Sequence, residues 1–181
     1  MLIVGLAPGY HGANRTGIPF WGDGAGEVLY DALAAAGCAH LPAGPGPRTA
    51  ARGPRLQQVR ITNAVKCVPP KNRPTPAEVR TCGMAYLAAE LAAPELRVVL
   101  TLGRLAFDAT FRASGRRPPR FAHGLEQVLD RGDPRGQLRL VASYHFSRYN
   151  LNTGVLSTDQ ARTIVARAVA LSGGVTDPPR G

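Results

Sequence analysis

The sequence alternates short apolar runs with segments of helical periodicity, and this alternation restricts the fold more than any other feature. The apolar runs, which we interpret as buried strands, cover residues 2–4, 59–65, 97–102 and 138–143. Helical spacing follows from Glu27 to Gly37, after the capping signal Thr75-Pro76, and over residues 104–113. Strands separated by helices are typical of a parallel sheet with helices on both faces. The sequence therefore predicts an α/β fold: a three-layer α/β/α arrangement with a central, mostly parallel four-stranded sheet.

Length and charge narrow the class of protein. The 181 residues suffice for one domain, which we assign to residues 1–172, followed by a C-terminal tail at 173–181. Lys and Arg number 22 against 12 Asp and Glu, and the net charge of +10 favours a polyanionic partner such as nucleic acid. No run approaches the roughly 18 apolar residues of a membrane span, and no signal peptide is recognisable. We expect a cytoplasmic monomer with no membrane partner.

Polar loops follow three of the predicted strands. They begin at Gly5, near Asn63 and at Tyr144. In parallel α/β sheets, binding sites collect at the carboxyl ends of the strands. We therefore expect three distant segments of the sequence to form one pocket.

The loop at residues 5–20, GLAPGYHGANRTGIPF, is the most informative of the three. Its glycines allow backbone N–H groups to approach a ligand closely, Arg15 and His11 can meet a phosphate, and Phe20 offers a stacking face. The alternative is a glycine-rich surface turn. The spacing matches neither a Walker-type loop nor a dinucleotide fingerprint, which disfavours a generic nucleotide-binding α/β enzyme.

Asn63 and His145 stand at the ends of two predicted strands. A buried Asn must find partners for both its donor and its acceptor, so Asn63 is either a satisfied structural residue or a reader of the amide edge of a base. A lone His is more often structural, but the position of His145 just beyond a strand favours a role in chemistry. His123 is ambiguous.

The three cysteines are too few for a disulfide framework. Cys67 and Cys82 are separated by a proline-rich link, and they are either buried thiols or metal ligands, although two ligands cannot hold a metal alone. Cys38 can be a packed residue at a helix end.

Taken together, these segments resemble the uracil-DNA glycosylase superfamily, and within it the iron–sulfur branch called family 5 or type B. Residues 5–20 are similar to the family's first motif, residues 61–82 to its central segment, and residues 143–154 to its closing motif. Three matched segments in the same order are more specific than any one of them. The resemblance implies a monofunctional DNA-repair glycosylase that hydrolyses the N-glycosidic bond of uracil in DNA and leaves an abasic site. Its partner would be DNA containing damaged bases.

The resemblance also implies residue roles. Phe20 would stack on the flipped base, Asn63 would read its edge, and His145 would donate a hydrogen bond to the base as negative charge develops there. The rest of the base pocket would be formed by Gly5, Ala7, Gly9 and His11. The DNA strand would be held by Arg15, Arg148 and Tyr149.

The chain departs from many members of the superfamily in its first motif. Leu6 and Ala7 stand where an acidic residue often positions water or stabilises the sugar cation. We expect Asp23 or Glu27 to lie near the sugar instead, or a water to be held by Asn63 and His11. Gly9 stands where the strictest uracil enzymes place a Tyr that excludes thymine, so the pocket should also accept hypoxanthine, xanthine or etheno adducts.

A [4Fe–4S] cluster is the cofactor that the resemblance implies. The branch uses four cysteines, two of which match Cys67 and Cys82 and two of which lie upstream of the first strand. The sequence begins directly on that strand, so we expect either a lost upstream segment or a variant without the cluster. The retention of Cys67 and Cys82 favours a lost segment.

An alternative to the enzyme is a damaged-DNA-binding protein that has lost catalysis, but the presence of His145 disfavours this alternative.

Overall fold

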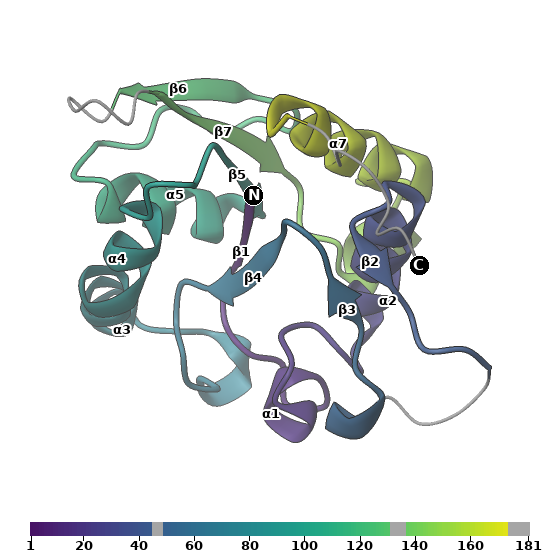
Figure 1. The fold of residues 1–181 in the computed structure, drawn as a ribbon. Coiled ribbons are helices and arrows are strands. Elements are labelled where there is room, and N and C mark those ends of the chain that lie inside the picture. The colour runs from purple at the N-terminus through teal and green to yellow at the C-terminus, as the bar shows by residue number, and fades with distance from the viewer. Residues whose placement is uncertain (45–48, 131–136, 174–181) are drawn as a thin grey trace.

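A five-stranded sheet forms the centre of the computed structural model, which describes residues 1–44, 49–130 and 137–173 (Figure 1). The strands follow the order β4-β1-β5-β7-β6 across the sheet, with β4, β1, β5 and β7 parallel and β6 antiparallel to β7. Their bounds are β1 Leu2–Gly5, β4 Arg60–Asn63, β5 Val98–Leu102, β6 Glu126–Asp130 and β7 Gln137–Ser143. The predicted α/β class is confirmed, and β6 is a fifth strand that the sequence pattern missed.

Helices cover both faces of this sheet (Figure 1). One face is covered by α2 Gly24–Ala35 and α7 Thr158–Leu171. The other is covered by α3 Pro76–Cys82, the π-helical η3 Gly83–Leu87, α4 Ala88–Leu91 and α5 Arg104–Ala113. The remaining elements are α1 Ala13–Thr16, α6 Arg148–Asn152, the 3-10 turns η1 Ala50–Arg52 and η2 Pro70–Asn72, and a two-stranded antiparallel sheet of β2 Ala39–His40 and β3 Arg55–Leu56.

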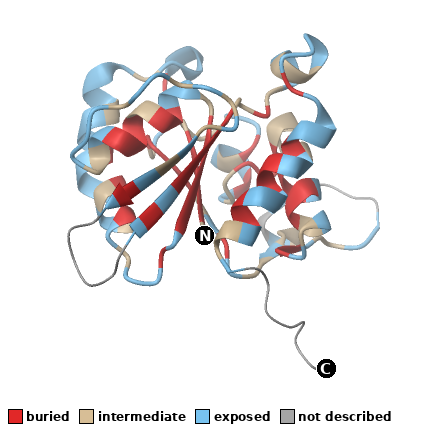
Figure 2. Ribbon diagram, turned by 90° about the horizontal axis from the view of Figure 1, so that it is seen from above, coloured by how far each residue is buried: buried red, intermediate tan, exposed pale blue. Residues whose placement is uncertain are grey.

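The strands supply two separate cores because successive side chains point to opposite faces. Ile3 packs among the residues of α2 and α7, whereas Leu2 and Val4 pack on the side of α5. Figure 2 shows the central strands buried along their length. A strand buried on both faces is a rigid support for whatever its carboxyl end carries.

Side-chain caps set the start of two helices near the predicted site. Thr75 Oγ1 accepts from Glu78 N at 3.2 Å, and Glu78 Oε2 accepts from Thr75 N at 2.6 Å, so the predicted capping box of α3 is confirmed. Asp23 Oδ1 accepts from Gly26 N at 2.8 Å and starts α2 at Gly24, earlier than the apolar spacing from Glu27 predicted.

Two further sequence predictions were a C-terminal tail and the lack of a membrane-spanning helix. Apart from Gly173, the predicted tail at 173–181 lies outside the described residues. Among the helices that the structure describes, none is long and apolar enough to cross a bilayer.

Candidate active site

The carboxyl ends of the parallel strands bring the three polar loops to one edge of the sheet. Gly5, the last residue of β1, stands beside Asn63, the last residue of β4. Leu102 at the end of β5 stands beside Ser143 at the end of β7, two residues before His145. The sheet itself therefore places Asn63 and the loops that carry Phe20 and His145 on one side of the molecule.

Gly5 allows Asn63 and Phe20 to meet at the end of β1. A Cβ built on Gly5 would overlap Asn63 Oδ1 and would lie 2.5 Å from Phe20 Cζ. Atoms at such separations cannot coexist, so any side chain at position 5 would displace the carboxamide or the ring. The absence of a side chain at Gly5 thus brings together two of the residues that sequence analysis assigned to the base pocket.

Phe20 is buried, with only 6% of its surface exposed, yet it has a left-handed backbone φ of +62°. A bulky residue in this region is strained, and such strain concentrates at functional sites. Tyr30 Oη donates to Pro19 O at 2.7 Å, directly before the strained residue. A Cβ on Gly26 would overlap Phe20 O, so α2 must carry a glycine here for the loop to pack against it.

Thr16 holds the same loop from the other side. Its buried hydroxyl lies 3.0 Å from Gly12 O and 2.9 Å from Trp21 O. Sequence analysis missed Thr16, Tyr30 and Gly26 because a hydroxyl or a glycine in a loop or helix has no sequence signal that separates a loop anchor from a surface residue.

His145 is half-buried and packs over Gly103, where a Cβ would lie 3.1 Å from His145 Cβ. The imidazole and the Phe20 ring are 6.3 Å apart between centroids, with an interplanar angle of 36°. Burial lowers the pKa of His145 below its ordinary value, because the charged form loses solvation. The imidazole is therefore neutral at pH 7 and can act as a hydrogen-bond donor through one ring nitrogen.

Asn63 carries an unsatisfied acceptor. Among the described residues, Asn63 Oδ1 is the one buried side-chain oxygen or nitrogen without a hydrogen-bond partner. An orphaned buried acceptor costs about 1–3 kcal/mol, so its presence requires an explanation such as a ligand. Asn63 also lines a cavity of about 530 Å³.

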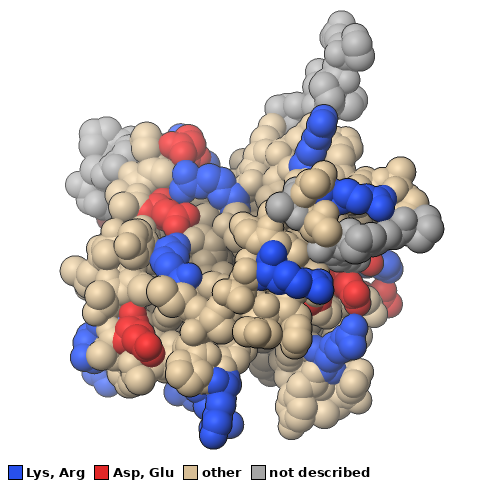
Figure 3. All heavy atoms as spheres, turned by 90° about the horizontal axis from the view of Figure 1, so that it is seen from below, with Lys and Arg blue, Asp and Glu red and all other residues tan. Residues whose placement is uncertain are grey.

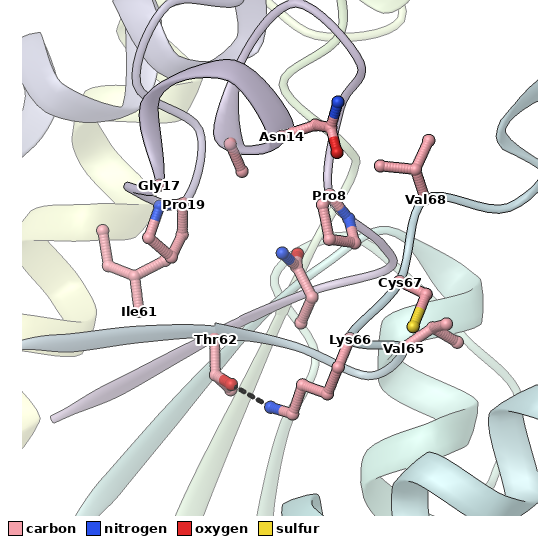
Figure 4. A pocket seen from close by; sticks show the side chains of 12 residues that line it. Pro8, Asn14, Gly17, Pro19, Ile61, Thr62, Val65, Lys66, Cys67 and Val68 are labelled. Atoms are coloured by element: carbon pink, nitrogen blue, oxygen red, sulfur yellow. Dashed lines mark hydrogen bonds between the residues drawn. The ribbon is translucent and has the colours of Figure 1, made fainter. Parts of the chain in front are cut away.

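This cavity opens between the segment after β1, which carries Pro8 and, in α1, Asn14, and the loop after β4, which carries Lys66 and Val68 (Figure 4). Its lining consists of Pro8, Ala13, Asn14, Gly17, Pro19, Ile61, Thr62, Asn63, Val65, Lys66, Cys67 and Val68. Of the predicted base-binding residues, the lining includes Asn63 alone. Lys66 Nζ donates to Thr62 Oγ1 and to Glu90 Oε1, the latter at 3.0 Å, so its charge is paired with a half-buried carboxylate.

The two acidic candidates lie in different surroundings. Asp23 Oδ1 caps α2, while Asp23 Oδ2 lies 3.0 Å from the position of a Cβ on Gly9 and 2.5 Å from that of a Cβ on Gly12. Sequence analysis predicted that the missing side chain at Gly9 leaves space for larger bases. In the structure, this space lies next to the Asp23 carboxylate. Glu27 instead pairs with Arg148, with 3.7 Å between Glu27 Oε2 and Arg148 Nη2, and both side chains are exposed.

The predicted DNA-contacting residues lie on the surface. Arg15 and Arg148 are exposed, as is Tyr149, which has 73% of its surface open to solvent. His11 is exposed and packs edge-on against Tyr10, with 5.1 Å between ring centroids, while Ala7 is half-buried. Figure 3 views the side on which α1 lies in Figure 1, where basic side chains are spread among a few acidic ones.

The cysteines do not form a complete metal site within the described residues. Cys67 is exposed, Cys82 is half-buried, and Cys38 is buried. In the part of the chain that the structure describes, no group of three or more His, Cys, Asp or Glu side chains could hold a metal ion. These residues alone do not fit a four-ligand cluster.

His123, whose role sequence analysis left open, makes contacts that are typical of a structural residue. Its Nδ1 accepts from Tyr144 N at 3.2 Å, and its ring stacks on the Tyr144 ring with a centroid distance of 5.0 Å. His123 thus supports the residue next to His145.

Comparisons with known proteins agree on one family. The family described as "Uracil DNA glycosylase superfamily" matches residues 1–168. The type-5 uracil-DNA glycosylase of Thermus thermophilus is 42% identical over 177 residues, which cover 96% of this chain and 76% of that protein. The type-5 enzyme of Pyrobaculum aerophilum is 41% identical over 175 residues, covering 96% of this chain and 72% of that protein. The Mycobacterium bovis type-5 enzyme is 42% identical over 178 residues, and this chain covers 63% of its length.

The lowered pKa of His145 gives a testable pH dependence. Because the unfolded chain binds the proton more readily than the folded one, the stability conferred by neutral burial is present above about pH 6.5 and is lost as the pH falls through the folded pKa. NMR titration should show the His145 imidazole titrating below about 6.5, and His145→Gln should flatten the fall of unfolding free energy between about pH 7 and 5. A His145 pKa at or above the ordinary value contradicts this expectation.

Proposed function

The chain belongs to the uracil DNA glycosylase superfamily, and we infer that it is a uracil-DNA glycosylase, a hydrolase that removes uracil from DNA during repair. The observation that carries this inference is the orphaned Asn63 Oδ1 beside the Phe20 ring at the end of β1. A polar acceptor and an aromatic face at one point suit a planar base with an N–H on its edge.

We propose that Asn63 reads the edge of a base flipped out of the helix. A carboxamide offers one donor and one acceptor, which match the carbonyl oxygen and adjacent N–H of uracil. Because Oδ1 has no partner among the described residues, the base N–H would satisfy it on binding. Phe20 would stack on the base, and its strained, anchored backbone means that the ring is placed before the substrate arrives.

His145 would stabilise the departing base. As the N1–C1′ bond breaks, its electron pair moves onto the base, and a neutral imidazole N–H can donate to the base carbonyl oxygen that gains negative charge. The lowered pKa supports this role, since the neutral form predominates at pH 7. Water adds at C1′ and gives up a proton, and the departing base anion takes up one proton, so the products are an abasic site and the free base.

Asp23 is the better of the two acidic candidates for guiding that water. One of its oxygens borders Gly9 and Gly12 in the loop after β1, whereas the Glu27 carboxylate faces Arg148 at the surface. The hydrogen bond from Gly26 N to Asp23 Oδ1 fixes the direction of the carboxylate, and its other oxygen, Oδ2, is a suitable acceptor for a water proton.

The substrate range and DNA contacts are finer parts of the proposal. The absence of a side chain at Gly9 would let the pocket accept hypoxanthine and xanthine beside uracil. Arg15 and Arg148 would contact phosphates, and the exposed Tyr149 would occupy or border the vacated stack. A [4Fe–4S] cluster is the proposed cofactor. Cys67 and Cys82 would supply two of its four thiolates. Iron and sulfide analysis of the protein would detect the cluster.

The first test is excision from labelled oligonucleotides that contain uracil, hypoxanthine or xanthine, read out by alkaline cleavage at abasic sites. We expect uracil to be removed and His145→Ala to slow single-turnover excision on the order of 10²- to 10³-fold, as loss of one transition-state donor does elsewhere. Specific binding of damaged DNA without cleavage by the wild-type protein would instead favour a recognition protein that has lost catalysis. Activity on uracil alone would reject the wider substrate range.

A matched pair of variants separates the acidic candidates. Asp23→Asn keeps an oxygen that can cap α2 but removes the charge, so we expect a folded protein with strongly reduced excision. Glu27→Gln removes only a surface ion pair and should retain the wild-type rate. The reverse ranking of the two rates would place the water at Glu27.

A further inference from the structure

We propose that Asn150 is a positioning residue for His145, acting through the backbone from which the imidazole projects. The proposal rests on the function inferred above for His145. It adds a residue that lies outside the predicted set, in the short helix α6.

The orientation of the His145 ring needs an explanation. Among the residues that the structure describes, neither ring nitrogen has a hydrogen-bond partner. In many sites, a hydrogen bond to one ring nitrogen sets the direction of the other. Here that direction depends on the backbone at position 145 and on the groups that pack against the ring.

Asn150 fixes this backbone. Its Nδ2 donates to His145 O at 2.8 Å. Asn150 in turn is held by two neighbours: Ser147 Oγ accepts from Asn150 N at 3.4 Å, and Asn150 O accepts from Leu156 N at 3.1 Å. Leu156 is fully buried in the core formed with α2 and α7, so the contact connects the His145 carbonyl to a rigid part of the molecule.

Gly103 limits His145 from the opposite side. Its φ of +92° is a conformation that favours glycine, and a Cβ there would lie 3.1 Å from His145 Cβ. Gly103 N donates to Ser143 O at 2.7 Å, which joins the ends of β5 and β7 under the loop. Phe146, the next residue, is fully buried. Asn150 and Gly103 thus constrain His145 from two sides. Loss of the Asn150 hydrogen bond would leave only the contact with Gly103, so the carbonyl of residue 145 could rotate and the imidazole ring would change direction.

A second copy of the same residue type provides the control. Asn152 lies in the same helix, is exposed, and makes no side-chain hydrogen bond within the described residues. Asn150→Ala and Asn152→Ala therefore make the same chemical change in the same element, and only the first removes a contact to the His145 loop. Asn150→Asp is a second variant that keeps the size of the side chain but cannot donate while ionised.

The test is single-turnover uracil excision by these variants, alone and in the His145→Ala background, together with DNA affinity and the NMR signals of the His145 imidazole. We expect Asn150→Ala and Asn150→Asp to slow excision on the order of 10²-fold, a loss typical of a misplaced catalytic group, while DNA affinity and the rate of Asn152→Ala stay at wild-type values. In the His145→Ala background, Asn150→Ala should cause no further loss, because both changes remove one unit.

Three results would overturn the positioning role: a wild-type rate in both Asn150 variants, a full additional loss in the His145→Ala background, or unchanged imidazole signals in Asn150→Asp. Failure of the proposed function looks different. In that case the wild-type protein does not excise uracil or His145→Ala excises at the wild-type rate, while the imidazole signals still report whether Asn150 orients the ring.

Discussion

The lack of a side chain at Gly5 is the constraint on which the site depends. Gly5 ends β1 beside Asn63 at the end of β4, and the register of two parallel strands leaves no freedom in their separation. Because no Cβ is present, the Asn63 carboxamide and the Phe20 ring can occupy one small volume above the end of β1. At the ends of the neighbouring strands β5 and β7, the absence of a side chain at Gly103 likewise leaves space for His145, which packs against it. Glycines at two adjacent strand ends thus allow the three side chains of the proposed site, Asn63, Phe20 and His145, to approach one another.

Such close packing requires anchoring, because the loop that carries Phe20 is strained. A left-handed bulky residue costs on the order of 1–3 kcal/mol and persists only when its surroundings determine it. Thr16, Tyr30 and Gly26 provide this environment through hydrogen bonds and a close backbone contact. The Phe20 ring, to which we assign stacking on the base, is consequently held in place without a ligand, so substrate binding would not have to supply the free energy of ordering this loop.

Sequence reasoning found the sheet, the convergence of three loops and the family, because these depend on strand order and on motifs that are continuous in the sequence. It missed β6 because this edge strand leaves Glu126, Val128 and Asp130 exposed and so lacks a buried run. It could not separate Asp23 from Glu27, because the cap of α2 and the ion pair with Arg148 depend on tertiary contacts. The contact of Asn150 with His145 was missed because nothing in the sequence reveals the partner of an Asn side chain.

The most direct measurement is the single-turnover rate of uracil excision by Gly5→Ala, compared with Gly83→Ala, whose added Cβ would meet nothing within 4 Å. Thermal unfolding of both variants shows whether the fold is retained. If Gly5 permits Asn63 and Phe20 to share the end of β1, folded Gly5→Ala should lose excision by at least about 10²-fold, as expected for a displacement near 1 Å, and Gly83→Ala should excise uracil at the wild-type rate. Wild-type excision by folded Gly5→Ala would contradict the dependence of the site on this glycine.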